Sequence, residues 1–148
     1  MTGGDFWILF MHFSSTLFMT GLIWFVQIVH YPLKAYVGPA GFADYQAAHV
    51  ERTGWVVGLP MIVEALSGAW ILVRFDSAQH IVLMWASMLV LLKVWLVTAA
   101  FSVRAHHQLS SGFTRGAHRM LVRTNWMRTA GWSVRTLLVL WFVKTTVS

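Results

Sequence analysis

The chain has 148 residues, of which 57% are hydrophobic and only 11% are charged. A soluble domain carries about 25% charged residues, so we expect this chain to lie in a membrane. Its formal net charge of +6 does not indicate a nucleic-acid partner, because the basic residues gather in segments that a membrane protein keeps in the cytoplasm. The absence of cysteine excludes disulfides, thiolate catalysis and cysteine-held metal clusters.

Four long apolar stretches predict an all-α fold, a four-transmembrane-helix bundle in a single domain over residues 1–148. Each stretch is long enough to cross a hydrocarbon core of about 30 Å at about 1.5 Å per residue. Tryptophans gather near the ends of the stretches, as in the aromatic belts at the two faces of a membrane. The expected spans are, in chain order, about 6–29, 55–73, 81–102 and 125–143.

The segment between spans one and two contains a stop, a turn and an amphipathic stretch. Pro32 is expected to end the first helix, because proline cannot donate a backbone hydrogen bond. The string Gly38-Pro39-Ala40-Gly41 is typical of a turn. From Phe42 to Arg52, aromatic residues and His49 recur on one helical face, which predicts a short helix lying in the membrane interface.

The distribution of lysine and arginine predicts the orientation. By the positive-inside rule, loops one and three face the cytoplasm and both termini face the periplasm of a bacterial inner membrane, with the lipid bilayer as the main partner. Only Arg74 and Lys144 lie on the other side. The basic residues of loops one and three are Lys34, Arg52, Arg104, Arg115, Arg119 and Arg123.

Three charged residues are expected near the bilayer midplane, and such residues mark candidate functional sites because they are costly in hydrocarbon. Glu64, Lys93 and Arg135 each lie nine or ten residues from the loop side of their spans, a depth of about 13–15 Å. In one interpretation Glu64 pairs with a cation and holds the bundle together. In the other, surplus positive charge attracts an anionic or carbonyl-bearing ligand. Glu64 would then accept a proton or act as a ligand, Arg135 would stabilise negative charge, and Gln27 and Lys93 would contact a cofactor.

The first span carries a single polar stripe. His12 and His30 lie eighteen residues apart on this stripe, which places them about 27 Å from each other. His12 is therefore expected to lie outside both polar layers. The stripe consists of His12, Thr16, Thr20, Gln27 and His30.

A second polar layer is expected toward the loop side. There Asn125 would orient a substrate and Arg128 would stabilise negative charge. His30 and His49 would act as acid–base groups or metal ligands, near His106. The histidine spacing matches no compact metal motif, so hydrogen bonding to backbone carbonyls is the alternative. Haem, a metal ion and a quinone all stay open as cofactors.

Four strings carry a resemblance: GLIWFVQIVHYP at 21–32, HVERT at 49–53, PMIVE at 60–64 and RTNWMRT at 123–129. In this combination the chain resembles a family of small bacterial four-helix integral membrane proteins, which implies the fold but no activity. The His30-Tyr31-Pro32 step and the Trp/Arg-rich last span are more distantly similar to anthrone-oxygenase-like membrane proteins. That similarity would imply oxygenation of a polycyclic aromatic.

These patterns lead to two main functional hypotheses, while a third, a transporter or channel, would require a dimer because four spans are too few for a monomeric carrier. The first is a membrane-embedded oxidoreductase or oxygenase-like enzyme that acts on an apolar or amphipathic substrate, in a polar pocket open toward the loop side. The alternative is a non-catalytic small subunit or assembly factor of a larger membrane complex. A homo-oligomer is compatible with both.

Overall fold

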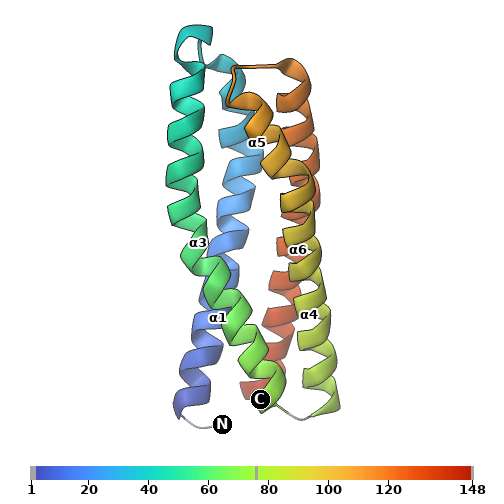
Figure 1. The fold of residues 1–148 in the computed structure, drawn as a ribbon. Helices are drawn as coiled ribbons and strands as arrows, with labels where there is room; N and C mark the ends of the chain where they lie inside the picture. The colour runs from blue at the N-terminus through green and yellow to red at the C-terminus, as the bar shows by residue number, and fades with distance from the viewer. Residues whose placement is uncertain (1–2, 76, 148) are drawn as a thin grey trace.

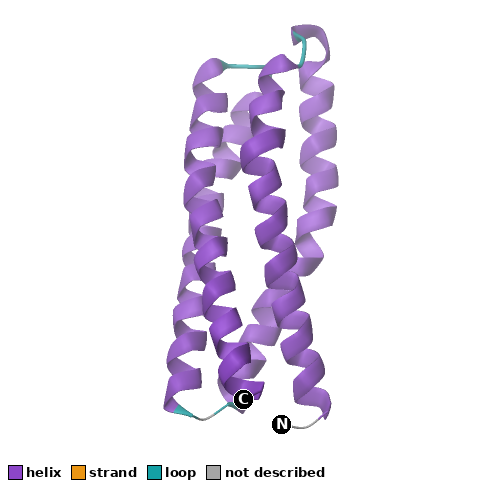
Figure 2. Ribbon diagram, turned by 180° about the vertical axis from the view of Figure 1, so that it is seen from behind, coloured by secondary structure: helices purple, strands orange, loops and turns teal. Residues whose placement is uncertain are grey.

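The structure, a computed structural model, describes residues 3–75 and 77–147 and consists there of helices joined by short loops (Figures 1 and 2). The elements form four long helical segments. These run alternately up and down, with both termini at one end, called here the terminal end (Figure 1). The opposite end, the loop end, holds the connections at residues 37–38 and 110–114. The all-α class is therefore confirmed.

Each long segment is a continuous helix or a series of helical turns. The first comprises α1 (Gly3–Phe25), a π-helical turn η1 (Val26–His30), α2 (Tyr31–Leu33) and a 3-10 turn η2 (Lys34–Tyr36). The second comprises a 3-10 turn η3 (Pro39–Gly41) and α3 (Phe42–Arg74). The third comprises α4 (Ala78–Val97), a second π-helical turn η4 (Thr98–Ser102) and α5 (Val103–Leu109), and the fourth is α6 (Arg115–Val147).

Three of these segments are long and apolar enough to cross a membrane, judged by length and composition: Gly3–Tyr36, Pro39–Arg74 and Ala78–Leu109. The fourth, α6, has 33 residues and is equally long. It is more polar because it carries the arginines that follow the last turn together with Arg128 and Arg135. The sequence therefore predicted the number and order of the long helices, while the crossing of the membrane by α6 stays a prediction.

Two expected boundaries differ in the structure. Residues 42–52 form the first turns of α3 and not a separate interfacial helix, since nothing between Arg52 and Trp55 interrupts the helical hydrogen bonds. The first helix also continues past Pro32 to Tyr36. A π-helical turn ends two residues before Pro32, and widening the helix there accommodates a ring that would otherwise press on the carbonyl one turn earlier. The turn after α5 uses Gly112 at φ 128°, a conformation that favours glycine.

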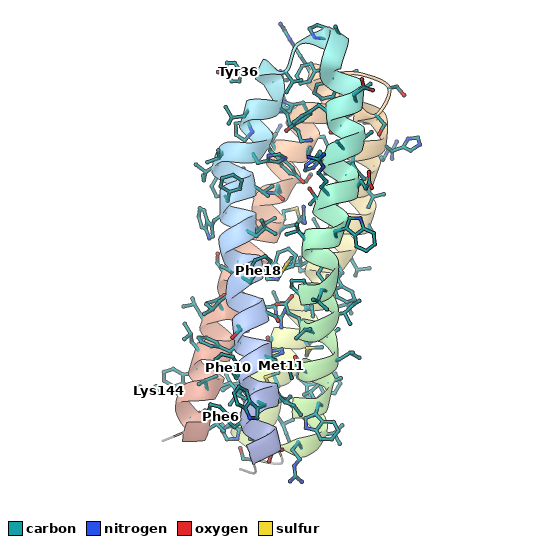
Figure 3. The ribbon with its side chains drawn as sticks, turned by 90° about the vertical axis from the view of Figure 1, so that its left-hand side faces the viewer. Phe6, Phe10, Met11, Phe18, Tyr36 and Lys144 are labelled. Carbon is teal, nitrogen blue, oxygen red and sulfur yellow. The ribbon has the colours of Figure 1, made fainter. Side chains whose placement is uncertain are left out.

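Exposed aromatic side chains define an apolar belt around the bundle. Figure 3 shows Phe6, Phe10, Met11 and Phe18 on the outer surface of α1. Three helices each carry two exposed tryptophans fifteen or seventeen residues apart, a rise of about 22–26 Å that is comparable with a hydrocarbon core. The pairs are Trp7 with Trp24, Trp55 with Trp70, and Trp126 with Trp141.

The interior alternates between apolar and polar layers. A small apolar cluster at the terminal end contains Leu9, Ile71, Met84 and Phe142. A larger one toward the loop end includes Met19, Ile23, Val94, Leu121 and Trp132. On each long segment, buried polar residues lie on the loop-end side of a member of the first cluster. The fold therefore presents polar side chains to one another across a bundle that is otherwise apolar at that depth.

Candidate functional site

The polar layer nearer the terminal end brings together one or two side chains from each long segment. Arg135 on α6 is its centre, and neither it nor Glu64 on α3 has any exposed surface. The Nη1 atom of Arg135 lies 2.8 Å from Oε1 of Glu64, and its Nε donates to Oγ of Ser87 on α4 at 3.1 Å. Its Nη2 lies 3.4 Å from Nε2 of His12 on α1. These residues, with Ser67, are called the ion-pair layer below.

The hydrogen bonds of the ion-pair layer fix the tautomer of His12. A guanidinium only donates, so His12 Nε2 accepts from Arg135 and Nδ1 carries the ring proton. Nδ1 then donates to Oγ of Ser67 at 2.8 Å, and Ser67 donates to the carbonyl of Val63. Trp132 Nε1 donates to the second oxygen of Glu64 at 3.4 Å. Every polar group of this layer is therefore paired, as buried polar groups require.

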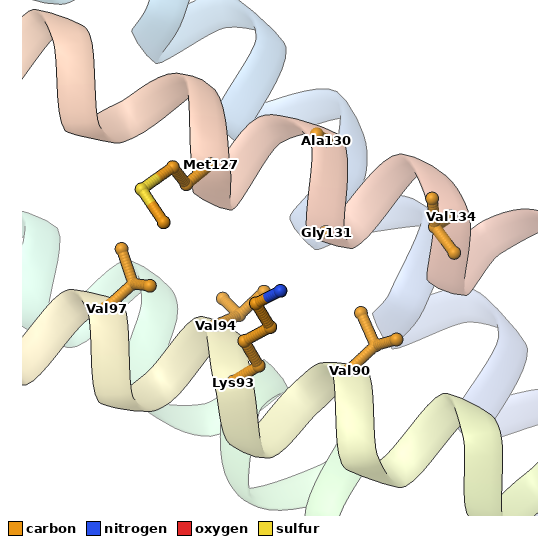
Figure 4. Close-up of a pocket in the computed structure, with 8 residues that line it drawn as sticks. All are labelled: Val90, Lys93, Val94, Val97, Met127, Ala130, Gly131 and Val134. Carbon is orange, nitrogen blue, oxygen red and sulfur yellow. The ribbon is translucent and has the colours of Figure 1, made fainter.

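The structure separates Lys93 from the other two midplane charges. Lys93 is exposed, and it lies in a groove between α4 and α6 on the outside of the bundle (Figure 4). On α4 the buried face passes through Ser87, Leu91 and Val94, and Lys93 projects from another side of that helix. Lys93 therefore does not share a layer with Glu64 and Arg135, and contact of Lys93 and Gln27 with a cofactor stays a prediction. His12, expected outside both layers, takes the place beside Arg135.

A second contact group lies nearer the loop end and contains three predicted residues. Asn125 Nδ2 donates to Oε1 of Gln27 at 2.9 Å, and Arg128 Nη1 donates to Oδ1 of Asn125 at 3.0 Å. Arg128 also lies 3.5 Å from Oγ of Ser102 and over the ring of Trp132, 5.7 Å from its centroid. Its buried Nε atom has no hydrogen-bond partner among the described residues. Arg128 is seven residues from Arg135, a rise of about 10 Å, so the two layers are distinct.

The histidines predicted at the loop end do come together. His30 Nε2 and His49 Nδ1 lie 2.9 Å apart, so one ring donates to the other. The ring centroids of His49 and His106 are 5.1 Å apart. Thr53 Oγ1 lies 3.1 Å from the same Nδ1 of His49. We call His30, His49 and His106 the histidine cluster.

Behind the histidine cluster lies a buried network that the sequence did not indicate. Tyr31 Oη lies 3.1 Å from Nε2 of His106, and Gln46 Nε2 lies 2.9 Å from Nδ1 of the same ring. Lys34 Nζ donates to Oε1 of Gln46 at 2.7 Å, and both side chains are fully buried. Lys34 was assigned to a loop because Pro32 was expected to end the helix. The continuation of the helix through η2 is what directs Lys34 into the bundle.

A lateral groove opens beside the histidine cluster, between the first segment and α3. Its volume is about 190 Å³. One part of its wall is apolar and the other part is polar. The apolar part consists of Leu22, Phe25, Val26 and Val56, and the polar part consists of His30, His49, Arg52 and Thr53. We call this the α1–α3 groove.

Both π-helical turns lie at the level of these polar groups. The turn η1 contains Gln27 and His30, and η4 contains Ser102, the hydroxyl that faces Arg128. A π-helical turn rotates the residues that follow it relative to a regular helix, and such turns are frequent at functional sites. The two wide turns therefore set the direction of side chains from the first and third segments toward α6.

The geometry of the predicted metal ligands does not resemble a metal centre. The Nε2 atom of His30 and the Nδ1 atom of His49 point at each other and lie 2.9 Å apart. Within residues 3–75 and 77–147, no group of three or more histidine or acidic side chains is placed to hold a metal ion. We therefore describe the cluster as a group of hydrogen-bonded imidazoles.

The polar stripe of the first span was the signal that pointed to the interior. His12, Thr16 and Gln27 are all buried. The sequence did not indicate the partner of His12, because Arg135 lies 123 positions further along the chain. No protein-family model, curated protein or solved structure matches the chain.

Proposed function

We propose that the chain is a four-span integral membrane protein of a bacterial inner membrane, with its loop end in the cytoplasm. Support comes from the three long apolar segments, from the two bands of exposed tryptophans, and from the basic residues at the loop end. The fourth span is α6, since Trp126 and Trp141 continue the two bands on it. Its two charged residues within this belt both have partners in the bundle, since Arg135 is paired with Glu64 and Arg128 donates to Asn125.

The function we propose is binding of an amphipathic molecule in the α1–α3 groove and acid–base chemistry on its headgroup. The observation that carries this proposal is the composition of the groove, whose apolar wall leads to the hydrogen-bonded His30–His49 pair. The apolar wall suits an acyl or isoprenoid tail. Arg52 on the polar wall suits a headgroup with negative charge, such as a carboxylate or a phenolate.

The histidine pair supplies the acid–base step. A neutral imidazole carries one donor and one acceptor nitrogen, so a hydrogen-bonded pair of rings accepts a proton at one end and releases one at the other. His49 is held on two sides, by His30 and by Thr53. The network of Tyr31, His106 and Gln46 positions the third imidazole behind it.

The other predicted catalytic residues take positioning roles in this proposal. Asn125 and Arg128 join Gln27 and Ser102 and lie on the inner side of the cluster, away from the groove. Glu64 and Arg135 neutralise each other further into the bundle. Their pairing corresponds to the bundle-holding interpretation of the sequence.

The distant similarity to anthrone-oxygenase-like proteins favours a redox form of the proposal. In this form the substrate is a phenol or a hydroquinone. Such a reaction needs an electron acceptor of the haem, metal or quinone class, or dioxygen itself. Spectra of the purified protein before and after reduction, with metal and quinone analysis, test this form. A spectrum without haem or quinone bands, and no metal, would leave dioxygen as the acceptor, and no dioxygen consumption with a hydroquinone would then restrict the proposal to acid–base chemistry.

Ligand binding can be tested with a fluorescent label, because the chain has no cysteine of its own. Val56→Cys places an environment-sensitive label in the groove, and Leu66→Cys places one on another exposed face of α3. Dodecanoate and a decyl hydroquinone should saturate the signal of the first label and leave the second unchanged. The same titration with dodecanol should be weaker, since it lacks charge and an acidic hydroxyl.

Substitutions then assign the headgroup contacts. Arg52→Gln and the double variant His30→Ala/His49→Ala should each weaken dodecanoate binding by roughly tenfold, the size of a lost charge-assisted hydrogen bond. Arg104→Gln, which removes an exposed arginine outside the groove, is the matched control. Equal signals from both labels with all three amphiphiles would show partition into the bilayer and reject the site.

A second candidate function is that of a small subunit of a larger membrane complex. The observation that favours it is Lys93, whose charge lies on the outside of the bundle within an apolar groove. This function and ligand binding in the α1–α3 groove involve different faces of the molecule.

A further inference from the structure

A groove with apolar walls lies on the outside of the bundle between α4 and α6. Its volume is about 310 Å³. Branched side chains of α4 form one wall and the middle of α6 forms the other (Figure 4). The residues that matter below are Val90, Lys93, Val94, Ala130, Gly131 and Val134.

Lys93 is the one charged residue among those lining this groove. In Figure 4 its side chain extends from α4 into the groove and its nitrogen points toward α6, on the side of Gly131. Gly131 is five residues from Trp126, on the side of Trp141, so this level lies about 7–8 Å inside the tryptophan band of the loop end. The ammonium group is therefore directed into the apolar belt and not toward the loop-end surface.

Within residues 3–75 and 77–147, no hydrogen bond or ion pair reaches Lys93. A lysine in the hydrocarbon region is costly, and in membrane proteins such residues pair with another group or mark a functional surface. Arg135 shows the contrast, because this chain pairs that charge fully inside the bundle. Lys93 thus has a place for an anionic partner that the protein itself does not fill.

We infer that a transmembrane helix of a different protein packs into the α4–α6 groove and places an aspartate or glutamate against Lys93. This inference rests on the membrane location proposed above, and on neither the ligand nor the chemistry proposed for the α1–α3 groove. The exposed small residue Ala130 beside the groove allows close approach of a second helix, as small residues do at helix contacts in membranes.

A second copy of this chain cannot supply the carboxylate. The full sequence has five acidic residues. Glu64 is buried against Arg135, and Asp5 is paired with Arg74 at the terminal end. Asp44 and Glu51 precede Trp55 and lie beyond the tryptophan band of the loop end. Asp76 lies outside the described residues, and its sequence position is in the connection after Arg74.

The inference can be tested with a synthetic helix in vesicles of phosphatidylcholine, a lipid without net charge. The probe is a fluorescent leucine–alanine peptide of about 20 residues with one central glutamate, and the control peptide has leucine at that position. Energy transfer from a donor attached to the protein reports binding. We expect the glutamate peptide to bind roughly tenfold more tightly than the leucine peptide, a ratio typical of polar contacts between transmembrane helices.

Protein variants identify the surface that the peptide uses. Lys93→Met should abolish the preference for glutamate, and Lys93→Arg should keep it because the charge stays. Ala130→Trp fills the groove from an exposed position and should block both peptides, whereas Leu66→Trp on an exposed face of α3 should not. Neither tryptophan enters the bundle interior, so loss of folding does not explain a difference between them.

Four results would overturn the inference. They are equal binding of the two peptides, an unchanged preference in Lys93→Met, peptide binding that anionic phosphatidylglycerol abolishes, and self-association of the protein that depends on Lys93. Brominated lipid quenches exposed tryptophans that contact the bilayer interior. This measurement therefore tests membrane insertion independently of peptide binding. A protein that inserts but does not discriminate the peptides rejects the partner helix alone, and one that does not insert rejects both.

Discussion

Arg135 donates to Glu64 across the bundle over 2.8 Å, and neither side chain has any exposed surface. The pair joins α6 to α3 between two apolar clusters. His12 and Ser87 add contacts from the first and third segments. One arginine thus contacts all three other segments, so its removal affects the whole bundle.

Breaking the pair from one side should destabilise the protein strongly. Glu64→Leu leaves Arg135 buried without its counter-charge, and we expect the free energy of unfolding to fall by about 3–5 kcal/mol. The double variant Glu64→Leu/Arg135→Met removes both charges and should recover most of that loss. Unfolding in detergent followed by circular dichroism measures each value. Arg74→Gln, which breaks a half-exposed pair with Asp5, should cost less than about 1 kcal/mol.

If the double variant is no more stable than Glu64→Leu, the pair is not the main contribution of these residues. A double variant that is stable but has lost ligand binding would return Glu64 and Arg135 to a direct role in the site. The two measurements therefore decide between the two interpretations of the midplane charges.

His12 should be neutral with its proton on Nδ1. The reason is that Arg135 donates to Nε2 and leaves Nδ1 to donate to Ser67. Nitrogen NMR of histidine-labelled protein distinguishes the two neutral tautomers and the cation. His12→Leu should cost about 1–3 kcal/mol by leaving Ser67 and Arg135 without this partner. A signal from the cation, or from the Nε2-protonated tautomer, would contradict the arrangement.

Gly131→Ala should destabilise the contact between α4 and α6. A Cβ atom there would lie 2.3 Å from Cγ2 of Val94, and a β-branched side chain has few other rotamers in a helix. We expect a loss of about 1–3 kcal/mol, the usual cost of overpacking. Gly58→Ala on α3 is the control, since nothing lies within 4 Å of its added Cβ. Similar unfolding curves for the two variants would mean that the helices separate without cost.

The buried pair of Lys34 and Gln46 should respond asymmetrically to substitution. Gln46→Leu removes the acceptor 2.7 Å from the ammonium group and leaves a buried charge that faces the Tyr31 and Tyr45 rings. Lys34→Met removes the charge itself. We therefore expect Gln46→Leu to cost more stability than Lys34→Met, by about 1–3 kcal/mol. Thermal unfolding of both variants and of the double variant checks the order, and the reverse order would contradict it.

The orientation can be tested by labelling single cysteines in intact cells. Ser111→Cys lies in the connection at the loop end, and Gln79→Cys lies at the start of α4 at the terminal end. A membrane-impermeant maleimide should label Gln79→Cys in intact cells and Ser111→Cys only after permeabilisation, because the basic residues stay in the cytoplasm. The opposite pattern would invert the topology, and labelling of both in intact cells would contradict a membrane-spanning bundle.

The charged residues of the spans show the limit of what a local sequence pattern predicts. The sequence pattern does not distinguish Glu64, Lys93 and Arg135, since each is a charged residue nine or ten positions from the loop side of an apolar stretch. Only the rotation of each helix about its axis separates them. Packing against three neighbours sets that rotation, and it turns Ser87 and Val94 inward and leaves Lys93 outside.

By itself the sequence determined that the chain is helical and apolar and how many long helices it forms, and it predicted polar groups at two depths. These properties follow from composition and from the 1.5 Å rise of a helix, which are local. The tertiary structure alone decided that His12 meets Arg135, that Lys34 enters the bundle, and that residues 42–52 extend α3. The contact of His12 with Arg135 joins helices far apart in the chain, and no local periodicity encodes which faces they present to one another. Lys34 turns inward because the helix continues past Pro32, and residues 42–52 join α3 because nothing interrupts its hydrogen bonds.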